Sequence, residues 1–169
     1  MTEEAQAGAD AMSPGPEHDR LKPFLGTFRA EVKLWMGPED PMVSTGTMTN
    51  TMVLDGRYLR QDYAGDPNEG PFPNFIGHGF WGYNGMAKRF EGFWIDNAST
   101  IMQFETGSVD ESGKVWTMTS EMVDPQGGTT AKRSVITLKD QDHNSIESFF
   151  TKEGEEFKAM EIQYSKAES

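Results

Sequence analysis

Residues 75–96 read FIGHGFWGYNGMAKRFEGFWID, two strand-length runs joined by Asn84-Gly85. Asn-Gly between β-prone runs is a strong hairpin signal, because both central residues of a type I′ turn need positive φ. A two-residue turn places Tyr83 opposite Met86 and sets the register of both strands. One face of this hairpin then carries glycines and aromatic rings, and we predict that this face points inward.

The other face of the predicted hairpin pairs His78 with Glu91 as an exposed cross-strand pair. A register one residue off would turn both side chains inward. A histidine oriented by a carboxylate can act as a general base. A barrel enzyme that uses His78 and Glu91 is therefore one alternative function.

Residues 77–82 also match the dinucleotide fingerprint G-x-G-x-x-G. That motif works by opening a helix whose N-terminus meets a pyrophosphate. Here a turn and a second strand follow the motif, so we interpret its glycines as strand glycines.

The rest of the chain repeats the alternation of apolar and polar residues that is typical of strands, and no amphipathic helix of normal length interrupts it. The strand-length runs are residues 27–34, 45–54, 57–63, 75–83, 86–96, 100–106, 114–123, 129–138, 144–151 and 156–164. Ten consecutive strands with short connections predict an all-β fold, an antiparallel up-and-down barrel in which closure removes the exposed edges. Ten strands also leave room for an interior cavity.

Residues 1–16 are small and acidic and contain two prolines, so we predict a disordered tail followed by a single barrel domain over residues 17–169. Residues 18–26 read as a short helical turn that ends at glycine, with Leu21 and Phe24 on one side. This turn can plug one mouth of the barrel. The proline-rich loop 65–73 is long enough to sit at a mouth.

A second tight hairpin at Asp55-Gly56 places Asn50 opposite Gln61 on an otherwise apolar inner face, and Arg57 joins them. Buried polar side chains need partners, because an unpaired one costs roughly 1–3 kcal/mol. We therefore predict contact with a ligand here, or, for Arg57, an ion pair with a buried carboxylate that ties the barrel shut.

The predicted function is the binding of a small, largely apolar molecule inside the barrel. The apolar walls are predicted to be Met48, Met52, Trp94 and Met118, and the polar anchors Asn50, Arg57, Gln61, Tyr63 and Tyr83. In the strand over residues 100–106, we predict that Met102 and Phe104 point inward. Thioethers are flexible and tolerate varied apolar shapes, which suits a permissive pocket, although an ordinary core uses them as well.

The chain of 169 residues has 27 acidic and 15 basic residues, hence a net charge of −12. This charge repels phosphate backbones and anionic lipids, so neither nucleic acid nor membrane is an expected partner. There is no cysteine, no apolar leader and no run of membrane-spanning length. These features predict a soluble cytoplasmic protein without a thiolate metal site.

Five short motifs occur in an order that resembles the DUF1579 family of uncharacterised, mainly bacterial proteins. They are His18-x-x-Leu21 leading to Gly26-x-Phe28, Leu54-Asp55-Gly56-Arg57-x-Leu59, the glycine-rich run 75–83, Phe90-x-x-x-Trp94-x-Asp96, and Met160-Glu161-Ile162-x-Tyr164. The resemblance implies a calycin-like barrel, related in fold to lipocalins, fatty-acid-binding proteins and nitrobindin-like haem barrels. The family carries no established activity, so its fold does not define a function.

Nitrobindin-like barrels hold haem through a histidine near the end of the chain. His143 is the counterpart by position, but no matching motif surrounds it. We predict no cofactor and keep haem binding as an alternative. A third class of function is an interaction module whose barrel is filled solid with side chains.

Overall fold

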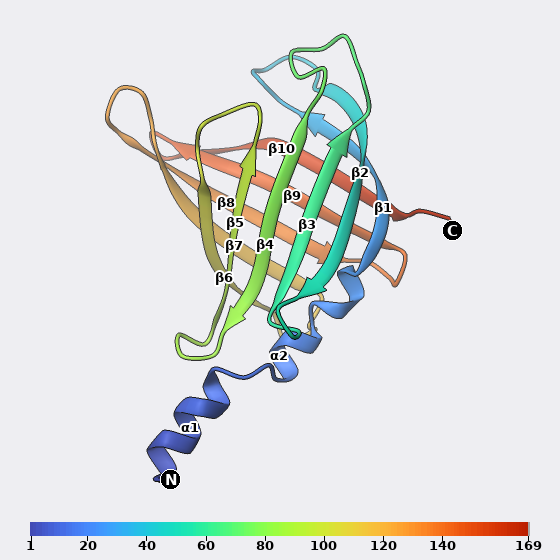
Figure 1. The fold of residues 1–169 in the computed structure, drawn as a ribbon. Helices are drawn as coiled ribbons and strands as arrows, with labels where there is room; N and C mark the ends of the chain where they lie inside the picture. The colour runs from blue at the N-terminus through green and yellow to red at the C-terminus, as the bar shows by residue number, and fades with distance from the viewer. Residues whose placement is uncertain (169) are drawn as a thin grey trace.

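The computed structural model describes residues 1–168 and forms a closed antiparallel barrel (Figure 1). The strands are β1 (Gly26–Leu34), β2 (Met42–Val53), β3 (Tyr58–Gly65), β4 (Ile76–Asn84), β5 (Arg89–Asp96), β6 (Gln103–Val109), β7 (Val115–Val123), β8 (Thr129–Leu138), β9 (His143–Lys152) and β10 (Glu155–Lys166). Each strand pairs with its neighbours in sequence, and β1 pairs with β10 to close the ring. The predicted ten-stranded up-and-down barrel is confirmed.

The hairpin of β2 and β3 has the predicted register, with Asn50 opposite Gln61. Its ladder ends at Val53 and Tyr58, and the turn between them uses positive φ at Leu54, Asp55 and Gly56. Leu54 is consequently exposed rather than on the inner face.

The predicted register of β4 and β5 is wrong. Tyr83 pairs with Phe90, and residues 85–88 form a four-residue loop. Asn84 Oδ1 accepts hydrogen bonds from the backbone N–H groups of Met86 and Ala87, and Lys88 takes the positive φ. Each partner shifts by four positions, an even number, so the inward face remains the predicted one.

The predicted plug closes one end of the barrel. It consists of α2 (Pro16–Asp19) and the 3-10 helix η1 (Lys22–Phe24), which precede β1. Leu21 and Phe24 are buried, and the Phe24 ring makes edge contacts with Trp81 and Trp116 at centroid distances of 5.1 and 5.2 Å. Figure 1 shows α2 at one end of the barrel and the longest loops at the other. The core at this closed end is Leu21, Phe24, Leu59, Trp81, Phe90, Trp116, Met118 and Ile136.

The segment that we predicted to be disordered contains α1 (Glu3–Ala11). Thr2 caps this helix through its hydroxyl, and the helix buries none of its side chains. The carbonyl group of Ala11 lies so close to Gly85 that a β-carbon there would approach its oxygen to 2.0 Å. Gly85 therefore allows the backbone at Ala11 to come close, and it does not supply the positive φ of a turn.

A second cluster of buried residues lies in the open half of the barrel and comprises Phe28, Ala30, Met48, Tyr63 and Tyr164. All of these side chains come from inward positions of β1, β2, β3 and β10. Within residues 1–168, no helix combines the length and the apolar composition needed to span a bilayer.

Candidate functional site

The open half of the barrel encloses a cavity of about 790 Å³. Pockets of roughly 300–1,000 Å³ are typical of sites that bind small molecules. The cavity runs from the plug at Phe24 to the loop over residues 66–75 at the opposite end, and this loop lies at the mouth as predicted. The barrel is therefore not filled solid.

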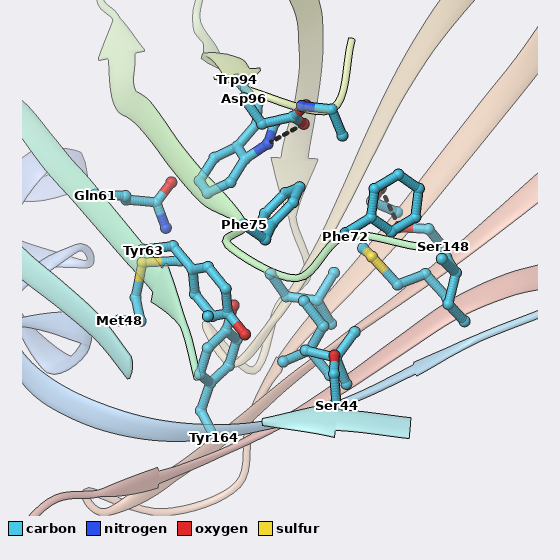
Figure 2. Close-up of a pocket in the computed structure, with 18 of the residues that line it drawn as sticks. Ser44, Met48, Gln61, Tyr63, Phe72, Phe75, Trp94, Asp96, Ser148 and Tyr164 are labelled. Carbon is cyan, nitrogen blue, oxygen red and sulfur yellow. Dashed lines mark hydrogen bonds between the residues drawn. The ribbon is translucent and has the colours of Figure 1, made fainter. Parts of the chain in front are cut away.

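The mouth loop places aromatic rings over the cavity. Phe75 makes an edge contact with Tyr63 at 5.8 Å between centroids, and Phe72 contacts Phe75 at 6.4 Å (Figure 2). Burial is the main cause that raises the pKa of the Tyr63 hydroxyl, so this group stays protonated.

Asp66 holds the start of the mouth loop against the outside of the barrel. Its carboxylate accepts hydrogen bonds from Arg29 of β1, at 2.5 Å, and from Thr45 of β2, at 2.7 Å. The Arg29 guanidinium, followed by the Thr45 hydroxyl, lowers the pKa of Asp66 to about 2. The loop is thereby attached to two strands other than its own.

Glycines make room for the Trp94 ring on the inner wall. A β-carbon on Gly77 would lie 2.0 Å from the Trp94 ring, and one on Gly79 would lie 2.9 Å from it. The Trp94 Nε1–H donates to Asp96 Oδ2 at 3.0 Å, which fixes the plane of the indole (Figure 2). The prediction that the face with glycines and aromatic rings points inward is confirmed.

A polar cluster that the sequence analysis did not identify begins on β6, the strand next to Trp94, where Gln103 pairs directly with Trp94. The Lys132 ammonium of β8 donates to Gln103 Oε1 of β6 at 3.0 Å, and Glu105 of β6 also lines the cavity. Burial raises the pKa of the Glu105 carboxyl, and the Lys132 charge only partly opposes this effect. No hydrogen bond or ion pair to this carboxyl comes from residues 1–168.

The prediction that Met102 and Phe104 point inward is wrong. Both are exposed, and Phe104 packs on the outside against Phe93 at 6.1 Å between ring centroids. This outer contact turns the alternate positions, Gln103 and Glu105, to the inside.

The β6 and β7 strands are paired over only part of their length. Their ladder runs from Val109 with Trp116 to Thr106 with Thr119, whereas β6 begins at Gln103 and β7 continues to Val123. Lys132 lies one strand beyond β7, opposite Ser120. Its long side chain thus reaches β6 by crossing the end of β7 that is not paired with β6.

Five of the nine predicted ligand-binding residues line the cavity: Met48, Asn50, Gln61, Tyr63 and Trp94. Asn50 has a structural contact as well, because its Nδ2–H donates to the Phe24 carbonyl oxygen at 2.8 Å and ties β2 to the plug. Its Oδ1 atom is buried without a partner among residues 1–168.

The other four predicted residues lie outside this cavity. Met118 is fully buried in the core at the closed end, and Met52 packs against that core. Arg57 and Tyr83 border a separate hollow beside His18, on the outside of the closed end. Within residues 1–168 no ion pair to Arg57 is present, and its side chain donates weakly to the Leu54 carbonyl oxygen at 3.5 Å.

The structure does not bring His78 and Glu91 together. His78 pairs with Ile95 across the strands, and its Nδ1 lies 2.7 Å from Asp62 on the exposed outer face. Glu91 instead accepts hydrogen bonds from Arg89 and Asn84.

His143 begins β9 at the closed end of the barrel and is exposed, with Nδ1 2.9 Å from Asp140. It does not line the cavity. Among residues 1–168, no group of three His, Asp or Glu side chains is arranged to hold a metal ion.

Several cavity residues were missing from the predicted site: Phe72, Phe75, Gln103, Glu105, Lys132, Ser134, Asn144, Ser148 and Tyr164. Ser134 and Ser148 are buried and hydrogen-bonded to each other at 3.0 Å. Strand alternation could have identified Lys132 and Ser134. They lie four and two positions before the inward-facing Ile136 on the same strand, and alternate residues of a strand share a face.

The fold and the cavity define a lipocalin-like barrel with a hollow, mostly apolar interior. The chain belongs to the DUF1579 family, described as proteins of unknown function, whose model matches residues 13–166. No curated protein matches the chain.

Two solved structures share the fold at low sequence identity. The Rv2717c protein of M. tuberculosis is 12% identical with a TM-score of 0.64, and the match covers 92% of this chain and 100% of that one. The S-type phycobiliprotein lyase CPES from Guillardia theta is 13% identical with a TM-score of 0.62, and the match covers 92% of this chain and 99% of that one. Both likenesses concern the fold alone.

Proposed function

We propose that this protein binds a small, largely apolar molecule inside its barrel. The observation that carries the proposal is the cavity of about 790 Å³, which is closed by the plug at one end and bordered by Phe72 and Phe75 at the other. Transfer of apolar surface from water into such a cavity contributes about 25 cal/mol per Å². The likeness to a phycobiliprotein lyase adds support at the level of the fold.

The arrangement favours binding over catalysis. The two groups proposed as an acid–base pair, His78 and Glu91, are not in contact, and His78 lies on the outer face. The cavity wall instead presents rings, aliphatic side chains and a few polar groups, which is the usual composition of a binding pocket.

The test uses N-phenyl-1-naphthylamine, a neutral apolar probe whose fluorescence rises in apolar surroundings. The excitation wavelength is chosen to excite the probe itself. The wild-type protein is expected to bind it. A double variant, Val32→Trp with Ile146→Trp, places two indoles in the cavity and is expected to weaken binding at least tenfold. Both side chains are partly buried and line the cavity.

The matched control is Val123→Trp with Ile76→Trp, because both of these side chains are exposed. It is expected to bind the probe like the wild type. The proposal is overturned if the wild type does not bind the probe. It is also overturned if the cavity-filling variant is folded and binds the probe as tightly as the control does.

A further inference from the structure

We infer that the polar cluster of Gln103, Glu105 and Lys132 selects a ligand with a neutral head that both donates and accepts hydrogen bonds, of which a primary carboxamide is the simplest. This inference rests on the proposed function, since it names the class of molecule that the cavity takes. Two of these side chains, Glu105 and Lys132, keep hydrogen-bonding groups that the described residues do not satisfy.

Lys132 has one donor engaged within the protein. Its ammonium carries three N–H donors, and one of them is given to Gln103 Oε1 at 3.0 Å. The side chain is part-buried and lines the cavity, so the remaining donors call for an acceptor that the ligand can supply.

Glu105 presents an acceptor without a partner. Its carboxyl lines the cavity, and no hydrogen bond or ion pair reaches it within residues 1–168. A β-carbon on Gly92 would lie 3.8 Å from Glu105 Cγ, so the side chain passes over the inner face of β5. A donor on the ligand would complete this group, which is costly to leave unpaired in a part-buried site.

The charges decide between kinds of head group. A carboxylate head would satisfy Lys132 but would meet the Glu105 carboxyl, and like charges repel strongly where water is scarce. An ammonium head would satisfy Glu105 but meet Lys132. A carboxamide offers its oxygen to Lys132 and its N–H to Glu105 without adding charge.

The cavity lining holds two more charged side chains, Asp96 and Glu69, of which the first is engaged by the protein and the second is exposed. Asp96 already accepts from Trp94 Nε1–H and from the backbone N–H of Ala98, both at 3.0 Å. Glu69 lies on the exposed mouth loop, where solvent screens its charge.

The experiment compares three ten-carbon compounds that differ only in the head: decanamide, decanoate and decylammonium. Each competes with N-phenyl-1-naphthylamine for the wild-type protein at pH 7.5. Decanamide is expected to displace the probe at a concentration at least about tenfold lower than the other two.

Two variants remove the cluster one group at a time. Glu105→Leu and Lys132→Met are each expected to lower the affinity for decanamide relative to the affinity for the probe by about tenfold or more. The controls, Glu121→Leu and Lys152→Met, alter exposed residues and are expected to change neither affinity.

The outcomes separate the two proposals. If the wild type does not bind the apolar probe, the proposed function itself fails. If it binds the probe but decanoate or decylammonium competes as well as decanamide, the head-group inference is wrong and the proposed function stands. Probe binding by each variant reports that its barrel has folded.

Discussion

At the scale of single residues, Glu105 combines burial with an ionisable group. Burial raises the pKa of its carboxyl in the folded protein, while the unfolded chain keeps the ordinary value. As pH rises from that ordinary value through the raised one, the unfolded state ionises first. The protein therefore loses stability over this window.

Glu105→Gln removes that loss because an amide does not ionise. The variant is expected to melt at a higher temperature than the wild type at pH 7.5 and at a similar temperature at pH 4. Thermal melts followed by circular dichroism across this range test the prediction, with the exposed Glu121→Gln as control. Parallel profiles for wild type and Glu105→Gln would contradict it.

Asn50 shows why a residue predicted from sequence can have two roles. Its position on the inner wall was predicted from the hairpin register, and the structure confirms that position. Its bond to the Phe24 carbonyl oxygen could not be predicted, because 26 residues separate the two and the plug meets β2 only in the folded barrel.

At the scale of elements, the plug closes the barrel by inserting Phe24 among the rings of β4 and β7. The Phe24 ring contacts Trp81 and Trp116 and is almost fully buried. Edge contacts between aromatic rings add to the free energy gained by burying their area. The closed end therefore depends on this short segment.

Phe24→Ala is expected to lower the free energy of unfolding by about 3–5 kcal/mol, since it leaves a cavity among those rings. Val123→Ala is the control, because Val123 is exposed, and it is expected to change stability by about 0.5 kcal/mol. Urea unfolding followed by tryptophan fluorescence measures both. Equal midpoints for the two variants would show that the plug does not stabilise the barrel.

The inward face of β6 is the element-level feature that the sequence analysis predicted wrongly. Residues 103–109 read QFETGSV, which lacks a regular alternation of apolar and polar residues, and the apolar pair Met102 and Phe104 favoured the wrong face. The outer contact with Phe93 decides the orientation, and that contact depends on the neighbouring strand.

At the scale of the whole molecule, the hollow interior couples binding to folding. A ligand that binds only the closed barrel raises the free energy of unfolding, by an amount that grows with the ligand concentration relative to its Kd. The cavity exists only when β1 and β10 pair to complete the ring. Probe binding and global unfolding should therefore be linked.

N-phenyl-1-naphthylamine at one hundred times its Kd is expected to stabilise the protein by about 2.7 kcal/mol and to raise Tm accordingly. Scanning calorimetry with and without the probe measures the shift. The cavity-filled variant with Val32→Trp and Ile146→Trp should show a much smaller one at the same probe concentration. A similar shift in both proteins would place the probe outside the cavity.

A reader of the sequence alone can predict the number of strands, their order and most of their inward faces, because a period of two is a local property of each strand. The inward face of β4 and β5 was predicted correctly despite the wrong register, because the register differed by an even number of residues. Which polar groups meet depends on the folded barrel, because Glu105, Gln103 and Lys132 come from β6 and β8, on either side of β7. Their proximity depends on where the β6–β7 ladder ends and on how the ring closes, and these are properties of many strands together.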